Sequence, residues 1–377
     1  MQKHSIKHKQ QIVSLISLLK EVPDPRVDRS KVHDWVDILL IALCSILCGG
    51  TRFYDMEAFA IVRLAWFKTF LRLPNGAPSH DPFNRVFAAL DGEAFADCLT
   101  RWTQSVRAVL GGEVVALEGK SLRRALNRGE DFRGIVNAWA TQSGLMLGQR
   151  KVRDKSNEIT AVPELLRALE LVGCIVTADA MHCQKEIARE IIEADADYVL
   201  SIKGNPGTPH QEIKIFLDDA INRNEKALAC LETVDKGHGR IETRRYWQSQ
   251  NIGWFADKGK WEGLRSVGRV ESLRETNGQQ TVERRYSLSR LACDIQRFAK
   301  AVRGHWSIEN QLHWVLEVVF GEDQARARTK QAAENLAALR RLAVSLLRQD
   351  KLCKPSVKGK LMRAAIDPDY LYHLLTF

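Results

Sequence analysis

The chain has 377 residues, of which 45% are hydrophobic and 27% charged, so it can bury a sizeable core and form more than one domain. That composition excludes collagen-like, low-complexity and intrinsically disordered chains. Lysine plus arginine (56) exceeds aspartate plus glutamate (46), and the net charge of +10 favours a polyanionic partner, nucleic acid before a membrane surface.

The cysteines and the apolar stretches indicate the compartment. The eight cysteines include no C-x-x-C pair, which is typical of free thiols in a reducing environment rather than of a disulfide framework or a zinc ribbon. The N-terminal residues lack the apolar region of a signal peptide, and the longest apolar run, 36–48, is too short to span a bilayer. We therefore expect a soluble, cytoplasmic protein with no membrane partner.

Up to about residue 110 the sequence predicts helices only. Asp81 followed by Pro82 has the form of an N-cap and a first helical residue. Gly49 and Gly50 end the apolar helix before them. The expected helices are 10–20, 34–48, 53–73, 83–90 and 93–110.

From residue 113 the pattern changes to short apolar runs alternating with helical periodicity. Strand-like runs precede and follow two amphipathic helices, and Pro163 falls in the first turns of the first helix. This order predicts a mixed sheet with helices on its faces. The predicted strands are 113–118, 134–141, 145–152, 174–178 and 198–203, and the helices are 156–171 and 184–194.

Residues 205–290 have a third character, with one helix at 210–222 followed by strand-like runs at 241–247, 264–270 and 281–288. We interpret this segment as a β-rich insertion. The chain is then predicted to be helical at 293–320 and 324–349, with a basic tail through Arg363.

Two carboxylates, Glu118 and Asp179, stand where predicted strands end. If these strands are neighbours, both side chains face the crevice at the carboxyl edge of the sheet, where α/β proteins bind ligands. Converging carboxylates suit hard divalent cations, and two such ions can assist displacement at a phosphodiester. The alternative for Asp179 is that it only caps the next helix.

A third candidate lies further along the chain. His305, Glu309 and His313 are four residues apart and are predicted to share one helix face, next to a buried stripe. A zinc site is an alternative, but the spacing does not match H-E-x-x-H and the sequence shows no third ligand.

These residues belong to motifs that make the sequence similar to a DDE-type insertion-sequence transposase of the H-repeat-associated branch. The resemblance covers nearly the whole chain. Its motifs are PSHD (78–81), EGKSLR (118–123), KSNEITAVPELL (155–166), TADAMHCQ (177–184), YVLSIKGN (198–205), GHGRIETR (237–244) and HWSIENQLHWVL (305–316).

The resemblance implies an α/β fold: an RNase H-like mixed sheet with flanking helices, a β-rich insertion before the last catalytic helix, and an all-α N-terminal domain ahead of it. The implied domains are a helical transposase-associated domain at 1–110 and a catalytic domain at 111–377. The catalytic domain includes the insertion at 205–290 and a basic helical part at 324–377.

The resemblance also implies function. It points to metal-dependent cleavage and strand transfer of DNA at transposon ends, with Glu118, Asp179 and Glu309 as catalytic and metal-binding residues. The implied cofactor is Mg²⁺, which Mn²⁺ could replace. The partners are double-stranded DNA, as terminal inverted repeats and as target, and a second copy of the chain. The implied location is the bacterial cytoplasm, at the nucleoid when bound to DNA.

One catalytic position departs from the family pattern, because Glu118 stands where relatives carry Asp in a D-G-K motif. The added methylene displaces the carboxylate, and Mg²⁺ demands near-ideal octahedral geometry. An alternative is therefore a weakened or inactive relic that acts only as a DNA-binding protein. A stand-alone RNase H-like nuclease is a further alternative, against which the full-length resemblance argues.

Basic and polar residues near these motifs are candidates for DNA contact. Arg326, Arg328, Lys330, Arg340 and Arg341 are expected to extend the basic surface and to give salt-sensitive affinity. The DNA-binding candidates are Lys120, Arg123, Lys203, Asn205, His238, Arg240, Arg244, Arg303, His305 and Asn310.

Overall fold

The computed structural model describes residues 15–26, 31–106, 111–122, 134–152, 157–204, 209–237, 240–276, 278–354 and 356–376. The chain folds into two compact units, each assembled from segments far apart in the sequence. The first unit comprises Met1–Ala108, Gly119–Ala161 and Ile308–Phe377, and the second comprises Val109–Glu118 and Val162–Ser307.

The first unit is mostly helical. Its two strands, β2 and β3, pair antiparallel, with a register shift between Ala138 and Trp139. The elements are α2 (Trp35–Leu47), α3 (Phe53–Val62), α4 (Leu64–Phe67), α5 (His80–Ala89), α6 (Gly92–Val106), β2 (Gly134–Ala140), β3 (Leu145–Val152), α11 (Ala332–Gln349), α12 (Val357–Ile366) and α13 (Pro368–Leu374). Two π-helical turns, Glu309–His313 and Val315–Val319, precede α11.

The core of this unit joins the beginning of the chain to its end. Helices α2 and α11 are buried along most of their length, as expected of helices that are enclosed by others. Helix α11 packs on α2, α5, α6 and β3. The buried Asn335 amide on α11 donates to the carbonyls of Phe87 (2.9 Å) and Leu90 (2.8 Å), which satisfies the C-terminal end of α5.

The first turn of α2 contains a carboxyl group that opposes folding at neutral pH. Burial, together with the charge of Asp34, raises the pKa of Asp37 from 3.8 to about 6, although the Leu73 backbone N–H bonds to it. The folded chain therefore binds this proton more tightly than the unfolded chain does. Stability contributed by the protonated group is lost as pH rises from about 4 through 6.

Replacing Asp37 by Asn should remove this cost, since the amide oxygen still accepts from Leu73. We expect Asp37→Asn to raise the free energy of unfolding at pH 7.5 by about 1–2 kcal/mol, after discounting the shift for partial exposure. Thermal melting at pH 4.5 and pH 7.5 measures this. An equal gain at both pH values would contradict the explanation, because the carboxyl group is mostly protonated at the lower one.

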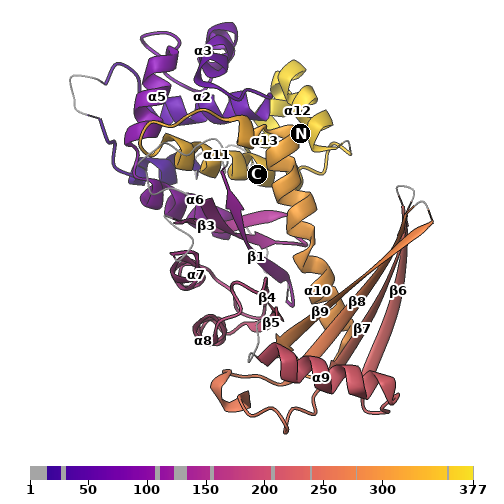
Figure 1. The fold of residues 1–377 in the computed structure, drawn as a ribbon. Helices are drawn as coiled ribbons and strands as arrows, with labels where there is room; N and C mark the ends of the chain where they lie inside the picture. Colours follow the sequence, from indigo (N-terminus) through magenta and orange to yellow (C-terminus); the bar gives the residue numbers. More distant parts are fainter. Residues whose placement is uncertain are drawn as a thin grey trace. The chain divides into compact units, whose positions relative to one another are not determined.

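The second unit is built on a sheet whose strands follow the order β1-β4-β5-β9-β8-β7-β6. Strands β1, β4 and β5 are parallel, and β5 pairs antiparallel with β9, which begins an antiparallel meander (Figure 1). The strands are β1 (Val114–Ser121), β4 (Ile175–Ala178), β5 (Asp197–Ile202), β6 (Ala229–Gly237), β7 (Arg240–Ser249), β8 (Ser266–Thr276) and β9 (Gln279–Ser289). The helices are α8 (Lys185–Glu193), α9 (Pro209–Asn222), α10 (Ile295–His305) and, from Val162 on, α7 (Asn157–Arg167).

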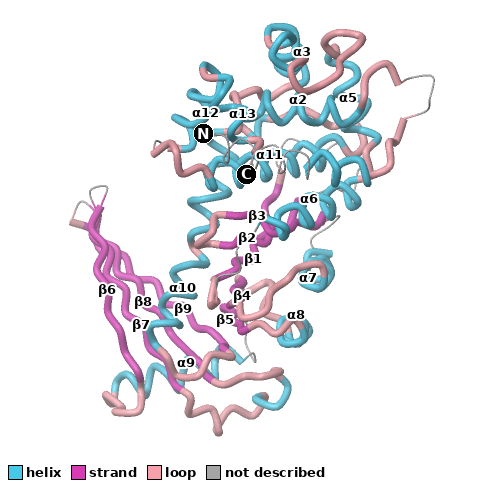
Figure 2. The backbone as a smooth tube through the Cα atoms, turned by 180° about the vertical axis from the view of Figure 1, so that it is seen from behind, coloured by secondary structure: helices cyan, strands magenta, loops and turns pink. Residues whose placement is uncertain are grey.

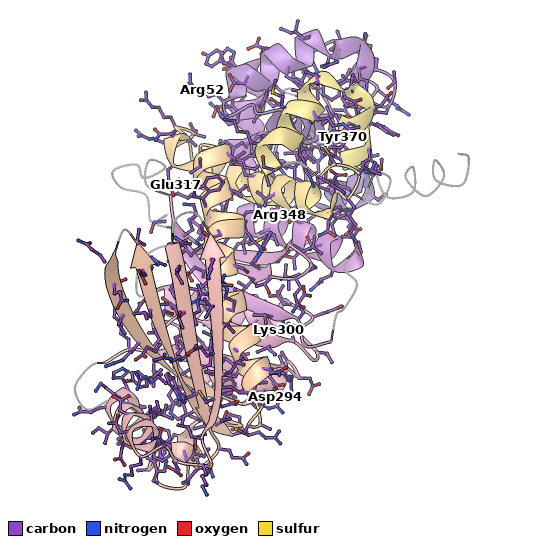
Figure 3. The ribbon with its side chains drawn as sticks, turned by 90° about the vertical axis from the view of Figure 1, so that its right-hand side faces the viewer. Arg52, Asp294, Lys300, Glu317, Arg348 and Tyr370 are labelled. Carbon is purple, nitrogen blue, oxygen red and sulfur yellow. The ribbon has the colours of Figure 1, made fainter. Side chains whose placement is uncertain are left out.

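Helix α10 covers one face of this sheet and fixes its core. Asp294, labelled in Figure 3, caps the helix by accepting from the Arg297 backbone N–H at 3.0 Å. Phe298, which is fully buried, lies directly on Gly268 of β8, where a Cβ would meet the ring at 2.3 Å. The glycine is therefore required for the helix to approach the strand this closely.

The structure confirms a mixed α/β fold with a large mixed sheet and many helices, and it corrects several predicted elements (Figure 2). Strand β6 was not predicted, because its alternating exposed residues include acids and a lysine. Helix α5 begins at His80 rather than Phe83, since Ser79 is its N-cap and Glu57 binds the His80 backbone N–H. Among the described residues, no helix is both long and apolar enough to cross a membrane.

The compact units divide the chain differently from the predicted domains. Because α11 shares a core with α2 and α5, the C-terminal segment belongs to the same unit as the N-terminal helices. The domain boundaries at 110 and 111 and the insertion at 205–290 stay predictions.

Candidate active site

The parallel pairing of β1 with β4 places two carboxylates side by side. Leu117 pairs with Ala178, the last residue of β4, so Glu118 and Asp179 follow at the same level of the sheet. Strand β1 runs to Ser121, further than the predicted end at Glu118 but in keeping with the carboxylate's position. Both side chains therefore stand at the carboxyl edge that the sequence predicted, within one compact unit.

Asp179 is held by the turn that follows its strand. Its Oδ1 accepts from the backbone N–H groups of Met181 (3.2 Å) and His182 (3.3 Å), and it lies 2.9 Å from His182 Nδ1. Helix α8 begins only at Lys185, with Gln184 as its N-cap, so Asp179 does not cap that helix. The alternative explanation of Asp179 is therefore wrong.

The surroundings of Asp179 keep it ionised. Burial alone raises the pKa of Asp179, but the hydrogen bonds and charge of His182 outweigh burial and lower it, and His305 lowers it further. The His182 side chain is only 1% exposed, whereas the Asp179 side chain is 40% exposed. A carboxylate that is anchored on one oxygen and still open to solvent is suited to binding a cation.

His305, the last residue of α10, contacts the two strands that carry these carboxylates. Its Nδ1 lies 3.1 Å from Thr177 Oγ1, and its Nε2 lies 3.4 Å from Glu118 Oε2. The preceding Gly304 lets the helix approach β1, since a Cβ there would meet the Val114 side chain at 3.1 Å. The buried imidazole thus has its ring fixed from one side while it faces Glu118 on the other.

Glu309 belongs to the first unit, so its convergence with Glu118 and Asp179 stays a prediction. It stands in a π-helical turn, where its Oε1 lies 3.5 Å from His313 Nδ1, and its side chain is half exposed. The π-helical turns replace the regular helix that was predicted there. Within the described ranges, no group of three His, Cys, Asp or Glu side chains lies together as a metal site would require.

Several DNA-binding candidates are already engaged by acids. Lys120 Nζ lies 3.5 Å from Asp323 Oδ1, and both side chains are nearly buried. Arg244 is buried against Asp235 and Glu242. Arg303, half exposed on α10, lies 3.2 Å from the same Asp235.

Other DNA-binding candidates are open to solvent or lie outside the described residues. Lys203, Arg240 and Asn310 are exposed, while Arg123, Asn205 and His238 fall among the residues that the structure does not describe. The DNA-binding roles of all these residues stay predictions.

The basic surface predicted near the C-terminus is partly wrong. Arg326, Arg328 and Lys330 are exposed, but Arg340 and Arg341 are 2% and 1% exposed. Arg341 donates to Asn137 Oδ1 (2.6 Å) and to Glu322 Oε1 (2.8 Å). Both arginines therefore belong to the core of the first unit rather than to a DNA-facing surface.

Sequence reasoning missed two residues near this site. His182 was not singled out, although its spacing three residues after Asp179 was visible in the TADAMHCQ motif. Arg285 on β9 lies over the ring of Trp306, 3.7 Å from its centroid, beside the end of α10. No local spacing links those two residues, so only the fold could have paired them.

Comparisons with known proteins identify the family of this chain. The family model described as "Transposase DDE domain" matches residues 110–346, and its associated model, "DDE_Tnp_1-associated", matches residues 16–103. A solved structure of the piggyBac transposase synaptic complex with hairpin DNA has a TM-score of 0.44 at 12% identity, covering 97% of this chain and 77% of that chain.

Two curated relatives match over almost their full length. "Putative transposase YncI" of Escherichia coli O157:H7 is 35% identical over 370 residues, which are 97% of this chain and 95% of the relative. "H repeat-associated putative transposase YhhI" of Escherichia coli K12 is 33% identical over 375 residues, with 97% and 98% covered. This chain therefore belongs to the DDE-type transposases of insertion sequences, in the H-repeat-associated branch.

Proposed function

We propose that this transposase cleaves DNA at the terminal inverted repeats of its element and transfers the resulting strand ends to target DNA, with Glu118, Asp179 and Glu309 as the catalytic acids of an RNase H-like domain. The parallel register that sets Glu118 beside Asp179 is the observation that carries the proposal. Bacterial DNA, a second copy of the chain and location at the nucleoid are parts of the same proposal.

The donor set suits a divalent metal ion. Carboxylate oxygens are the ligands that Mg²⁺ prefers, and Asp179 combines an anchored Oδ1 with an open side chain. When bound, such an ion supplies Lewis-acid stabilisation of the charge that develops at the phosphodiester. We propose Mg²⁺ as the physiological ion and Mn²⁺ as a substitute.

The protein's own residues orient these acids. The turn at Met181 and His182 holds Asp179, and His305 lies within ion-pair distance of Glu118 while Thr177 fixes its ring. The longer Glu118 side chain is thereby held towards His305. An aspartate at this position would place its carboxylate nearer the strand and away from the imidazole.

Cleavage of end-labelled DNA carrying the element's terminal repeats tests the proposal. We expect the native protein to cut in Mg²⁺, and Glu118→Asp to cut about tenfold faster. In Mn²⁺ the difference should shrink, because Mg²⁺ demands the stricter octahedral geometry. Cutting by Glu118→Asp alone would identify this copy as inactive because of Glu118. Failure of both proteins to cut, with DNA binding intact, would count against the assigned acids.

A further inference from the structure

Strand β6 forms one edge of the sheet in the second unit. It pairs with β7 on one side, and on its other side no described strand pairs with it (Figures 1 and 2). The strand runs from Ala229 to Gly237, long for an edge strand. Its outer backbone N–H and C=O groups are therefore available to another chain.

On one face of this strand, the charged residues are arranged so that they complement the same face of a second, antiparallel copy of the strand. Side chains alternate between the faces of a strand, so Glu232, Val234 and Lys236 project from the same face. Glu232 is half exposed and Val234 is 52% exposed. Lys236 is exposed and forms no ion pair with any residue that the structure describes. An acid and a base thus flank an exposed apolar residue at equal spacing.

We propose that β6 is a self-association surface, which pairs antiparallel with β6 of a second copy of this chain around a two-fold axis at Val234. In that register Glu232 stands opposite the partner's Lys236, and symmetry repeats the contact. Val234 stands beside the partner's Val234. The two sheets join into one across the axis, by hydrogen bonds between the two edge strands.

The charges select this register over its neighbours. An axis at Glu232 would set two carboxylates opposite each other, and an axis at Lys236 would set two ammonium groups opposite each other; both arrangements are destabilising. Shifting by one residue would move the side chains of one strand to the other face. Arg245, which bonds Glu232 at 2.6 Å, leaves this carboxylate half exposed for a second cation.

A lone lysine on an edge strand usually discourages pairing. Here Glu232, which lies on the same face four residues before Lys236, changes that outcome, because it pairs with Lys236 of the second copy. Val234 belongs to a row of side chains that crosses the sheet through Thr243 and Leu273 to the exposed Val282 on β9. Pairing at Val234 therefore joins this row to the same row of the second copy. The interface assigns a surface to the second copy of the chain that the proposed function includes, and it does not rest on the assigned acids.

Charge reversal in the full-length chain, without DNA, tests the register. We expect Glu232→Lys and Lys236→Glu to weaken self-association at least tenfold each in sedimentation equilibrium, because like charges then face each other twice. Mixing the two variants should restore association to within about threefold of native, since every facing pair is again opposite in charge. Glu275→Lys is the matched control: it makes the same change on the same face of β8, an interior strand, and should have little effect.

A cross-link gives a second, independent readout. In a Cys230→Ser background, Val234→Cys should form a disulfide-linked dimer under mild oxidation, because residues opposite each other in antiparallel strands have Cα atoms close enough for a disulfide. Lys236→Cys in the same background faces the partner's Glu232 and should not cross-link to itself. Persistence of the dimer in every charge variant, absence of self-association in the native chain, or failure of the mixture to restore it would overturn the proposal.

Discussion

Asp179→Asn is expected to reduce DNA cleavage by at least about 10³-fold, the largest functional effect that the geometry of the site suggests. The variant removes one negative charge from the carboxyl edge of β1 and β4. Its remaining side-chain oxygen can still accept from the Met181 and His182 N–H groups, so the turn keeps its shape. Cleavage of end-labelled terminal-repeat DNA in Mg²⁺ measures the loss.

DNA binding should survive the same substitution. Affinity for DNA comes largely from cations that neutralise phosphates, and removal of one acid does not weaken that term. Because the neighbouring histidines lower the pKa of Asp179, the native carboxyl is ionised at all pH values near neutrality. The deficit of Asp179→Asn should therefore be equal at pH 6.5 and pH 8.5.

Asp195→Asn is the matched control for this experiment. Asp195 is exposed in the turn between α8 and β5, at the opposite end of the parallel strands. Its φ of 53° is left-handed, a conformation that asparagine also tolerates. Cleavage should stay within about twofold of native. A comparable loss in both variants would show that net charge, rather than a metal-binding carboxylate, limits the reaction.

The sequence could predict the strand-end acids because their signals are local. A short apolar β-branched run followed by Asp179 and an amphipathic helix fixes where the strand ends, and Glu118 follows a similar run. Parallel pairing of β1 with β4 then sets the two side by side without further information. His305, by contrast, reaches Glu118 only because α10 crosses β1 at Gly304, which depends on tertiary packing.

Burial of charged residues could not be predicted in this way. Arg340 and Arg341 are two adjacent arginines, a pattern that suggests a solvated surface, yet both are buried. The partners of Arg341 are Asn137, about 200 residues earlier, and Glu322, which precedes the helix. Edge strand β6 was missed because its exposed side chains include charged residues, which do not follow the pattern of a buried strand. Only its pairing with β7 identifies it as a strand.

Arg341→Met should lower the free energy of unfolding by about 3–5 kcal/mol, the largest stability effect that the structure suggests. Arg341 Nε donates to Asn137, and Nη1 donates to Glu322 and to the Ala337 carbonyl at 3.0 Å. The Arg341 and Glu322 side chains are each 1% exposed, so losing the guanidinium leaves a buried carboxylate without its partner. Thermal melting should show a fall of roughly 5–10 °C.

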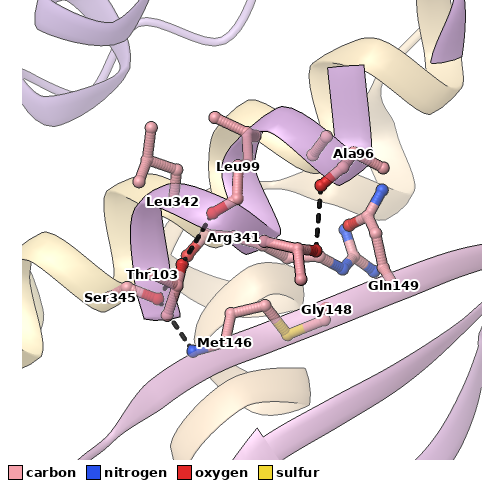
Figure 4. Close-up of a pocket in the computed structure, with 11 residues that line it drawn as sticks. Ala96, Leu99, Thr103, Met146, Gly148, Gln149, Arg341, Leu342 and Ser345 are labelled. Atoms are coloured by element: carbon pink, nitrogen blue, oxygen red, sulfur yellow. Dashed lines mark hydrogen bonds between the residues drawn. The ribbon is translucent and has the colours of Figure 1, made fainter. Parts of the chain in front are cut away.

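The guanidinium also lines a cavity of about 20 Å³ between α6, β3 and α11, large enough for about one water molecule (Figure 4). Its Nη2 has no hydrogen-bond partner among the described groups, so the arginine is itself incompletely satisfied. The favourable interaction of the guanidinium is therefore its ion pair with Glu322, and Arg341→Met breaks this pair.

A double-mutant cycle separates pairing from packing. Glu322→Met alone should also destabilise, because it leaves Arg341 buried and unpaired. The double variant, Arg341→Met with Glu322→Met, should recover most of the loss, since neutral side chains of similar size replace a buried ion pair at little net cost. Arg326→Met makes the same chemical change at an exposed position and should shift stability by less than about 0.5 kcal/mol. Additive losses in the double variant would show that each residue acts through its own packing, and that the ion pair does not organise the core joining α11 to β2.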